Sequence, residues 1–329
     1  MTPGDSASDL VQPKRRLIRK WRSTLIRLLG VFMASLFALP ALAQGNGGVP
    51  NATPGGCYIR INAAPSAWII EGYDPFSGYA AEGTYSVVFL NDSTKECAFY
   101  PSFELTQPPF GLSRGTGQPI PYAILDLGEA RDVTPRAGRT LRQPSARRIV
   151  LSANESKSVL YKLVAQPREG SDAGTFTQDL TIEAQDDNFR SLGGATLVVG
   201  LTIQPSARIG LAGAYSFRDG QAVVDLGALR PGPAPVPLHL RVNSTGAYEI
   251  SVTSANSGHL RLGSSEWSIP YAIAIGDQRL NLSGPRTISS SSTSGHRRDS
   301  LPLNFVIGDV ADKRAGYYSD TISIAVAAR

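Results

Sequence analysis

The last stretch of the sequence, residues 315–329, most limits the fold that this chain can adopt. It reads Ala-Gly-Tyr-Tyr-Ser-Asp-Thr-Ile-Ser-Ile-Ala-Val-Ala-Ala-Arg. From Tyr318 onward every second residue is apolar, and only Asp320 interrupts the series. The apolar face holds Tyr318, Ile322, Ile324, Val326 and Ala328. A period of two predicts a β-strand with one buried face.

An earlier part of the chain repeats this pattern. Residues 173–184, Ala-Gly-Thr-Phe-Thr-Gln-Asp-Leu-Thr-Ile-Glu-Ala, match the closing stretch, and the match continues upstream. The further matched pairs are 158–164 with 300–306, 121–124 with 270–273, and 87–91 with 239–243. Agreement in both halves of the repeat predicts two copies of one domain.

The two copies differ at their ends. The first continues into residues 195–203, where Leu197, Val199, Leu201 and Ile203 alternate on one face. The second has no such stretch after its closing strand. If the copies share a fold, the second lacks one strand and keeps a groove of unpaired backbone. Such an edge aggregates unless another chain fills it.

The N-terminus has the features of an export signal. Seven basic residues precede an apolar run at 28–42, which ends in Ala41-Leu-Ala43. This predicts a signal peptide over residues 1–43, cut before Gln44. The alternative is an uncleaved membrane anchor, but the run is short for a span and contains Pro40. Without residues 1–43 the chain has 25 basic and 25 acidic residues, so its charge does not indicate a nucleic-acid partner.

Two cysteines follow the expected signal, Cys57 and Cys97, both in the first copy. In an oxidising compartment the default is a disulfide, which stabilises by about 4 kcal/mol for a loop of this length. The alternative is a catalytic or metal-binding pair. No histidine lies in the first copy to support that alternative.

The predicted fold class is all-β, with two immunoglobulin-like β-sandwich domains. Short apolar runs separated by turn residues are typical of paired sandwiches. The expected segments are a flexible mature N-terminus at 44–56, domains at 57–203 and 207–329, and a linker at 204–206. Strands are expected in the first domain at 58–63, 85–90, 97–105, 122–127, 148–151, 158–165, 175–184 and 195–203. In the second domain they are expected at 222–226, 237–243, 248–253, 271–275, 301–307 and 317–328.

Two connections in the first domain are rich in large apolar side chains. Residues 66–79 and 107–112 are broken by Gly and Pro, which favours irregular loops. Apolar residues on stiffened loops are candidates for an exposed binding patch. The alternative is that they plug the ends of the sandwich, since most large apolar residues are buried. The candidates are Trp68, Ile69, Ile70, Tyr73, Phe76, Tyr79, Phe110 and Leu112.

One motif matches a catalytic pattern. Gly111-Leu-Ser-Arg-Gly115 fits G-x-S-x-G, which in hydrolases needs a strand feeding a helix together with a downstream acid and histidine. Here a Pro-Pro-Phe loop precedes Ser113. The histidines, at 239, 259 and 296, lie in the other domain without metal-ligand spacing. We therefore expect no catalytic residue, metal or cofactor, with a secreted serine hydrolase as the remaining enzymatic alternative.

The closing stretch resembles the terminal motif of spore coat protein U-type domains, the pilins of archaic chaperone-usher pili. Leu226, Gly227 and Pro231 resemble that family's early Phe-Gly-x-x-x-Pro turn. The resemblance implies completion of the second domain by a strand of an adjacent pilin subunit. It also implies a periplasmic chaperone and an outer-membrane usher as partners. The residues implied in chaperone and subunit binding are Gly316, Tyr318, Ile322, Ile324, Val326 and Arg329.

A shaft pilin must also give a strand, and residues 44–56 offer one valine among glycines and prolines. Proline lacks the N–H that such pairing uses. The chain is therefore expected to accept a strand and donate none, which places it at a pilus tip on the cell surface. Two-domain subunits of this kind in the resembling family are tip adhesins. The apolar loops would then grip an abiotic or host surface and support biofilm formation. The alternative is a minor or coat-like subunit without adhesive function.

Overall fold

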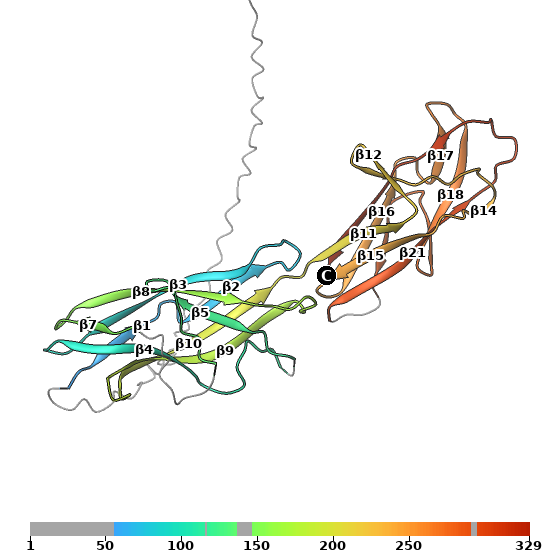
Figure 1. The fold of residues 1–329 in the computed structure, drawn as a ribbon. Coiled ribbons are helices and arrows are strands. Elements are labelled where there is room, and N and C mark those ends of the chain that lie inside the picture. The colour runs from blue at the N-terminus through green and yellow to red at the C-terminus, as the bar shows by residue number, and fades with distance from the viewer. Residues whose placement is uncertain (1–55, 116, 137–146, 291–294) are drawn as a thin grey trace, which may run out of the picture. The chain divides into compact units, whose positions relative to one another are not determined.

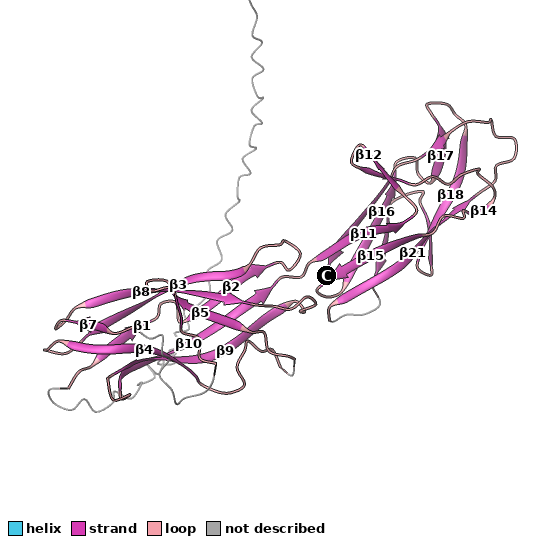
Figure 2. Ribbon diagram, viewed as in Figure 1, coloured by secondary structure: helices cyan, strands magenta, loops and turns pink. Residues whose placement is uncertain are grey.

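The computed structural model describes residues 56–115, 117–136, 147–290 and 295–329. All regular secondary structure in these ranges is β-strand (Figure 2). The expected signal peptide at 1–43 and nearly all of the expected flexible segment at 44–56 lie outside the described residues. Within the described ranges no helix is long and apolar enough to cross a membrane.

Residues 57–203 form the first unit, here called the N-terminal sandwich (Figure 1). Its strands are β1 (Ile59–Asn62), β2 (Ala67–Tyr73), β3 (Ala81–Asn91), β4 (Cys97–Leu105), β5 (Tyr122–Asp126), β6 (Arg131–Asp132), β7 (Ile149–Leu151), β8 (Ser156–Ala165), β9 (Gly174–Gln185) and β10 (Ser191–Ile203). One sheet has the order β1-β3-β8-β5-β6 and the other β2-β10-β9-β4-β7. The neighbours pair antiparallel, apart from β2 and β10, which are parallel.

The two sheets pack face to face through aromatic side chains. Phe89 of one sheet lies 5.2 Å from Phe99 of the other, between ring centroids. Trp68, fully buried, stacks on Tyr85 across the core with centroids 5.2 Å apart. Contacts of this kind between two mainly antiparallel sheets are typical of an immunoglobulin-like β-sandwich. The expected fold class is therefore confirmed.

A disulfide joins Cys57 to Cys97, with Cα atoms 5.7 Å apart. It ties Cys57, two residues before β1, to the first residue of β4. The described residues contain no free cysteine. The expected pairing is thus present, and the two cysteines have a structural role at one end of the sandwich.

Residues 207–329 form the C-terminal sandwich. Its strands are β11 (Ala207–Gly213), β12 (Ser216–Arg218), β13 (Gln221–Val223), β14 (Gly232–Pro233), β15 (Leu238–Ser244), β16 (Tyr248–Ser254), β17 (His259–Leu262), β18 (Ser268–Ile275), β19 (Gln278–Asn281), β20 (Arg286–Ser289), β21 (Arg297–Ile307), β22 (Tyr318–Ser319) and β23 (Ile322–Ala328). The larger sheet has the order β11-β15-β21-β18-β17-β22, with β14 on β21 and β19 on β18. The smaller sheet is β20-β16-β23, and β12 and β13 form a separate hairpin.

The two sandwiches have corresponding strands. β5, β8 and β9 of the first match β18, β21 and β23 of the second. In the first, Tyr122 pairs with Ala165, and in the second Tyr271 pairs with Ile307. One sequence match, residues 87–91 with 239–243, is wrong by one position. The pairing partners match buried Val87 with buried Leu240. In a strand a slip of one residue exchanges the two faces, so approximate letter matches do not fix the register.

Several strands differ from those expected. The segment at 66–79 contains the regular strand β2, and β11 begins directly after the linker at 204–206. The strand expected at 222–226 ends at Val223, where the β12–β13 hairpin ends. In each case, pairing with a neighbouring strand decides whether the segment is a strand and where it ends. The residue pattern of one segment does not reveal such pairing.

Asp320 marks the point where the chain passes from one sheet to the other. β22 pairs with β17 in the larger sheet, whereas β23 pairs with β16 in the smaller one. The Asp320 carboxylate accepts hydrogen bonds from the Tyr271 hydroxyl (2.6 Å), the Ser254 hydroxyl (2.5 Å) and the Asn256 amide (3.0 Å). Burial and this bond raise the pKa of the Tyr271 hydroxyl, which therefore stays protonated as a donor. The interruption in the alternating pattern is thus a sheet crossover held by hydrogen bonds.

Replacing Asp320 with Ala should weaken this crossover. The donors of Tyr271, Ser254 and Asn256 would lose their acceptor, and each unpaired buried group costs roughly 1–3 kcal/mol. Since the site is only partly buried, we expect the free energy of unfolding of the C-terminal sandwich to fall by about 2–3 kcal/mol. Urea denaturation measures this change. Asp277→Ala, at an exposed turn, is the control, and an equal loss there would contradict the assignment.

Candidate functional site

An apolar groove runs between two edge strands of the C-terminal sandwich. Among the described residues β11 pairs only with β15, and β23 pairs only with β16. A cavity of about 1240 Å³ opens between them, with residues 221–229 along another side. Its apolar floor comes from the larger sheet and includes Leu240, Leu260, Ile269, Tyr271, Leu303 and Phe305. The groove is therefore bounded by strand edges and lined by the core.

The walls of this groove are incompletely covered. Ile322, Ile324 and Val326 of β23 are only half-buried, as are Ile209 and Leu211 of β11. Alternate residues of both strands therefore face inward without the cover that a neighbouring strand gives. A strand edge with exposed backbone groups beside uncovered apolar side chains is a template for another strand.

The N-terminal sandwich shows what fills the same place in its own fold. There β10 lies between β9 and β2 and pairs with both. Leu197, Val199 and Leu201 of β10 are at most 1% exposed. Because β9 corresponds to β23, the groove of the C-terminal sandwich is the space that β10 occupies in the first copy.

The side of the groove at residues 224–229 includes the Leu226-Gly227 turn. Val224, Leu226 and Leu229 pack partly against the core. Residues 224–227 belong to no strand, although they follow β13 directly. Gly227 has a φ of 68°, and its amide donates to the Asp225 carboxylate at 2.8 Å. A side chain at this φ would be strained, which is a physical reason for glycine here.

Most of the residues expected to bind a partner strand lie at the groove. Gly316, Tyr318, Ile322 and Ile324 line the cavity. Val326 lies further along β23. Arg329 is placed differently, because its guanidinium pairs with Glu249 at 3.3 Å and its amide donates to the Ala247 carbonyl at 2.9 Å.

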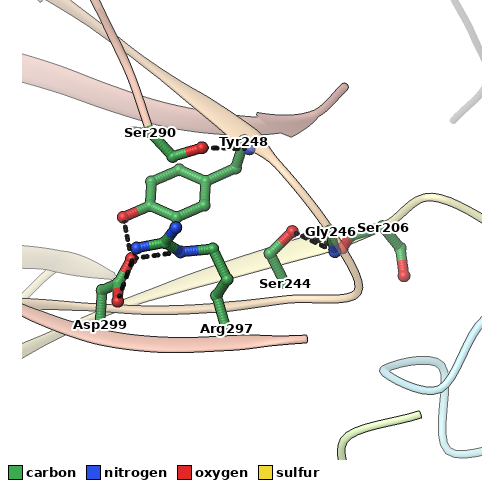
Figure 3. A network of polar contacts seen from close by, with 7 residues as sticks. All are labelled: Ser206, Ser244, Gly246, Tyr248, Ser290, Arg297 and Asp299. Carbon is green, nitrogen blue, oxygen red and sulfur yellow. Dashed lines mark hydrogen bonds and ion pairs between the residues drawn. The ribbon is translucent and has the colours of Figure 1, made fainter. Parts of the chain in front are cut away.

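One end of the C-terminal sandwich is closed by polar contacts (Figure 3). The Tyr248 hydroxyl donates to Asp299 at 2.5 Å, and the Arg297 Nε donates to the same carboxylate at 3.0 Å. The Tyr248 amide donates to the Ser290 hydroxyl at 3.0 Å. Burial raises the pKa of Asp299, but the hydrogen bonds from Arg297 and Tyr248 outweigh it and hold the pKa below its ordinary value. An ionised Asp299 thus fixes the start of β16, beside the end of β23.

Three of the apolar candidates in the N-terminal sandwich are buried in its core. Trp68 and Leu112 are fully buried, and Ile70 is 8% exposed. Trp68 and Ile70 face inward because residues 67–73 form a strand on β10 and not a loop. These three residues cannot form an exposed surface, and they plug the sandwich.

Most of the other candidates lie at the end of the sandwich, here called a pole, where the chain leaves for the linker; Ile69 lies inside β2, opposite Gly200. Tyr73, the last residue of β2, pairs with Ile203, the last residue of β10. The loop at 74–80, which carries Phe76 and Tyr79, therefore lies at this pole. Tyr79 is 80% exposed. Phe110, whose ring centroid lies 4.8 Å from that of Tyr122, is half-buried like Ile69, Tyr73 and Phe76.

The opposite pole carries exposed apolar residues that sequence reasoning did not identify. It includes the loops at 92–96, 152–155 and 186–190, which the strand directions bring together, and the turn at 127–130 points toward it from beside the middle of β8. Leu127 and Phe189 are 43% and 58% exposed. The Asp186 carboxylate accepts hydrogen bonds from the amides of Asn188 and Arg190, which orders the turn that presents Phe189. Only the strand order shows that these loops share a pole.

The catalytic pattern at Ser113 lacks its structural context. Ser113 forms a bridge with Thr177, and its amide donates to the Thr177 carbonyl at 2.9 Å. The residues that follow it in the described chain form no helix. In the part of the chain that the structure describes, no group of three or more His, Cys, Asp or Glu is placed to hold a metal ion.

No protein-family model matches this chain, and no curated protein matches it. Among solved structures it is similar to the CsuC–CsuE chaperone-tip adhesion subunit pre-assembly complex from archaic chaperone-usher Csu pili of Acinetobacter baumannii. The identity is 13% and the TM-score 0.42, over 82% of this chain and 100% of that chain. It is also similar to CfaE, the adhesive subunit of CFA/I fimbria of enterotoxigenic Escherichia coli, at 14% identity and a TM-score of 0.33. That match covers 79% of this chain and 90% of the other.

Proposed function

We propose that this chain is a subunit of a chaperone-usher pilus whose C-terminal sandwich accepts a β-strand from another protein. The observation that carries the proposal is the open groove between β11 and β23, in a chain whose first copy holds β10 in the corresponding place. A strand added there would pair with the free edge of β23 and cover the apolar floor. The chain would act in binding and assembly and not in catalysis.

Two classes of partner fit such a groove. A periplasmic chaperone would lend a strand during export, and an adjacent pilin subunit would replace it at the outer-membrane usher. Both would use main-chain hydrogen bonds for affinity and alternate apolar side chains for specificity. The half-buried Ile322 and Ile324 are the side chains that either partner would cover.

The strands that each sandwich contains support a place for this chain at the pilus tip. The N-terminal sandwich already contains its own last strand, so it offers no groove to a neighbour. Residues 44–56 contain few apolar side chains with which to fill another subunit's groove. A subunit that accepts a strand at one sandwich and donates none stands at the end of a fibre, exposed at the cell surface.

Attachment to an abiotic or host surface would use the pole of the N-terminal sandwich opposite the linker. Phe189 is exposed there, Leu127 is exposed on the turn that points toward it, and the pole is not attached to the linker. Apolar area removed from water contributes about 25 cal/mol per Å². Attachment of this kind would support biofilm formation. Tyr79, although more exposed, lies at the pole that joins the linker.

Ile324→Asp should abolish capture of a partner strand. A carboxylate on the inward face of β23 would have to be buried without a counter-charge under the donor strand, which is strongly unfavourable. Co-expression with candidate periplasmic chaperones, followed by co-purification and limited proteolysis, measures capture. We expect the wild-type chain to be protease-resistant only in the complex.

Ser323→Asp is the matched control, since Ser323 is the neighbouring residue on the exposed face of β23. It should leave capture unchanged. Equal capture by the Ile324→Asp variant, or full resistance of the isolated wild-type chain, would show that the groove is not a strand acceptor.

The double substitution Leu127→Ser and Phe189→Ser should reduce attachment of cells that carry the pilus to polystyrene. The variant loses the apolar contacts of these two side chains with the surface. We expect the number of retained cells to fall several-fold, because a loss of only about 1.4 kcal/mol of binding free energy weakens binding tenfold. Tyr79→Ser is the control at the linker pole and should have little effect. If attachment depends on Tyr79 instead, the binding surface has been placed at the wrong pole. If neither changes it, the chain is a non-adhesive minor subunit.

A further inference from the structure

We propose that the outer face of the larger sheet of the C-terminal sandwich binds an extended acidic polysaccharide. Such a polymer carries sulfate, phosphate or carboxylate groups along its length. The observation that carries the proposal is a sheet face with five arginines and no carboxylate. This inference does not rest on the strand-acceptor groove, because the groove opens on the inner side of the sheet, where Leu240 and Phe305 form its floor.

The strands of the larger sheet direct their basic side chains outward. Burial alternates along each strand, so the exposed residues lie on the face away from the core. Asp299 is the one acidic residue in the strands of this sheet, and it points inward to Tyr248. The outer face therefore carries positive charge without a carboxylate on the same strands. Its exposed arginines, with β19 included, are Arg208, Arg241, Arg261, Arg279 and Arg298.

Three of these arginines form a compact group. Arg208 and Arg298 lie on the two sides of Asn243 in register with it, so their Cα atoms are about 10 Å apart, two strand spacings. Arg241 is the diagonal neighbour of both, at about 7–8 Å. These separations are close to the Debye length at physiological salt, so the three charges repel one another. A ligand with several negative charges in a row would remove this repulsion.

The arginine side chains of this face are accessible. Arg208, Arg241 and Arg279 make no ion pair or side-chain hydrogen bond with the residues that the structure describes. Arg298 pairs with Glu169 of the β8–β9 connection at 2.8 Å, but the two side chains are 59% and 90% exposed. Exposed pairs of this kind contribute little, so a polyanion can displace Glu169. Gly210, which faces Arg241 across the strand pair, has open space where a side chain would stand.

Basic residues of the other sheets have acidic partners. In the N-terminal sandwich Lys162 pairs with Glu82 at 2.7 Å. On the smaller sheet of the C-terminal sandwich Glu249 pairs with Arg329 at 3.3 Å. A surface that serves only solubility mixes both signs of charge in this way. The outer face of the larger sheet has one sign only, which indicates a ligand of the opposite sign.

The residues between the arginines indicate which class of polyanion fits. No Phe, Tyr or Trp faces outward on this sheet, and Gly210, Asn243 and Ser300 are small or polar. Single-stranded nucleic acid is held by bases stacked on aromatic rings, and a membrane surface is held by apolar side chains that enter it. Arginine binds carboxylate, sulfate and phosphate groups through paired hydrogen bonds and needs neither. Because the arginines are spread over β11, β15, β17, β19 and β21, they fit an extended polymer better than one small anion.

Binding of the purified full chain to heparin, a sulfated polysaccharide, and to alginate, a carboxylated one, tests the proposal. The double substitution Arg208→Gln and Arg241→Gln removes two charges at exposed positions, and thermal unfolding checks that the variant is folded. We expect it to weaken binding at least about tenfold at low salt. The slope of log K against log salt concentration should fall by about two, because two fewer counterions are released. Binding of heparin alone would assign the face to sulfate or phosphate groups, and binding of both polymers would include carboxylates.

The matched control is the double substitution Arg218→Gln and Arg230→Gln, at exposed arginines outside this sheet. It changes the net charge equally and should leave the affinity nearly unchanged. Arg208→Lys with Arg241→Lys keeps both charges and should retain most of the binding. An equal loss in the control, unchanged binding in the Arg208→Gln and Arg241→Gln variant, or no binding of the wild-type chain to either polysaccharide would overturn the proposal. Tighter binding to a DNA duplex than to both polysaccharides would exclude a polysaccharide as the occupant.

Discussion

The free edge of β23 is the constraint on which the rest of the C-terminal sandwich depends. A strand paired on one side leaves its other row of N–H and C=O groups to water, and here the inward side chains are also uncovered. An unpaired edge can accept a partner strand only if β23 keeps its position before the partner binds. The hydrogen bonds of Asp320 hold one end of β23 and those of Arg329 hold the other. The open edge is thus part of an otherwise fixed strand.

The N-terminal sandwich solves the same problem within the chain. β10 pairs on both sides and buries its inward aliphatic side chains almost completely. Because the order β9-β4-β7 of the first copy recurs as β23-β16-β20 in the second, the place of β10 beside β9 can be compared directly with the free edge of β23. This contrast within one molecule is stronger evidence for a missing strand than the shape of the groove alone.

Sequence patterns predicted the parts of the fold that depend on local alternation. The strand expected at 97–105 has those bounds in the structure, and the absent strand followed from comparing the two copies. The patterns failed where pairing decides the outcome. Residues 66–79 contain glycine and proline and suggest a loop, yet β10 provides a parallel partner that makes residues 67–73 a strand. Which loops share a pole depends on strand order, so the exposure of Phe189 at the free pole could not be deduced from its segment.

Asp320 is a polar side chain inside an apolar groove. The two copies of the domain give the same explanation for a polar residue at this position. Tyr271 donates to Asp320 at 2.6 Å, and in the first copy the corresponding Tyr122 donates to Gln178 at 3.0 Å. Gln178 is nearly buried beside Val199 of β10, which shows that an aliphatic strand residue can lie over such a pair. Covering Asp320 would leave its bonds to Tyr271 and Ser254 intact, so no hydrogen bond of the carboxylate within the sandwich need be lost. The polar position therefore secures the crossover without preventing an apolar strand from entering.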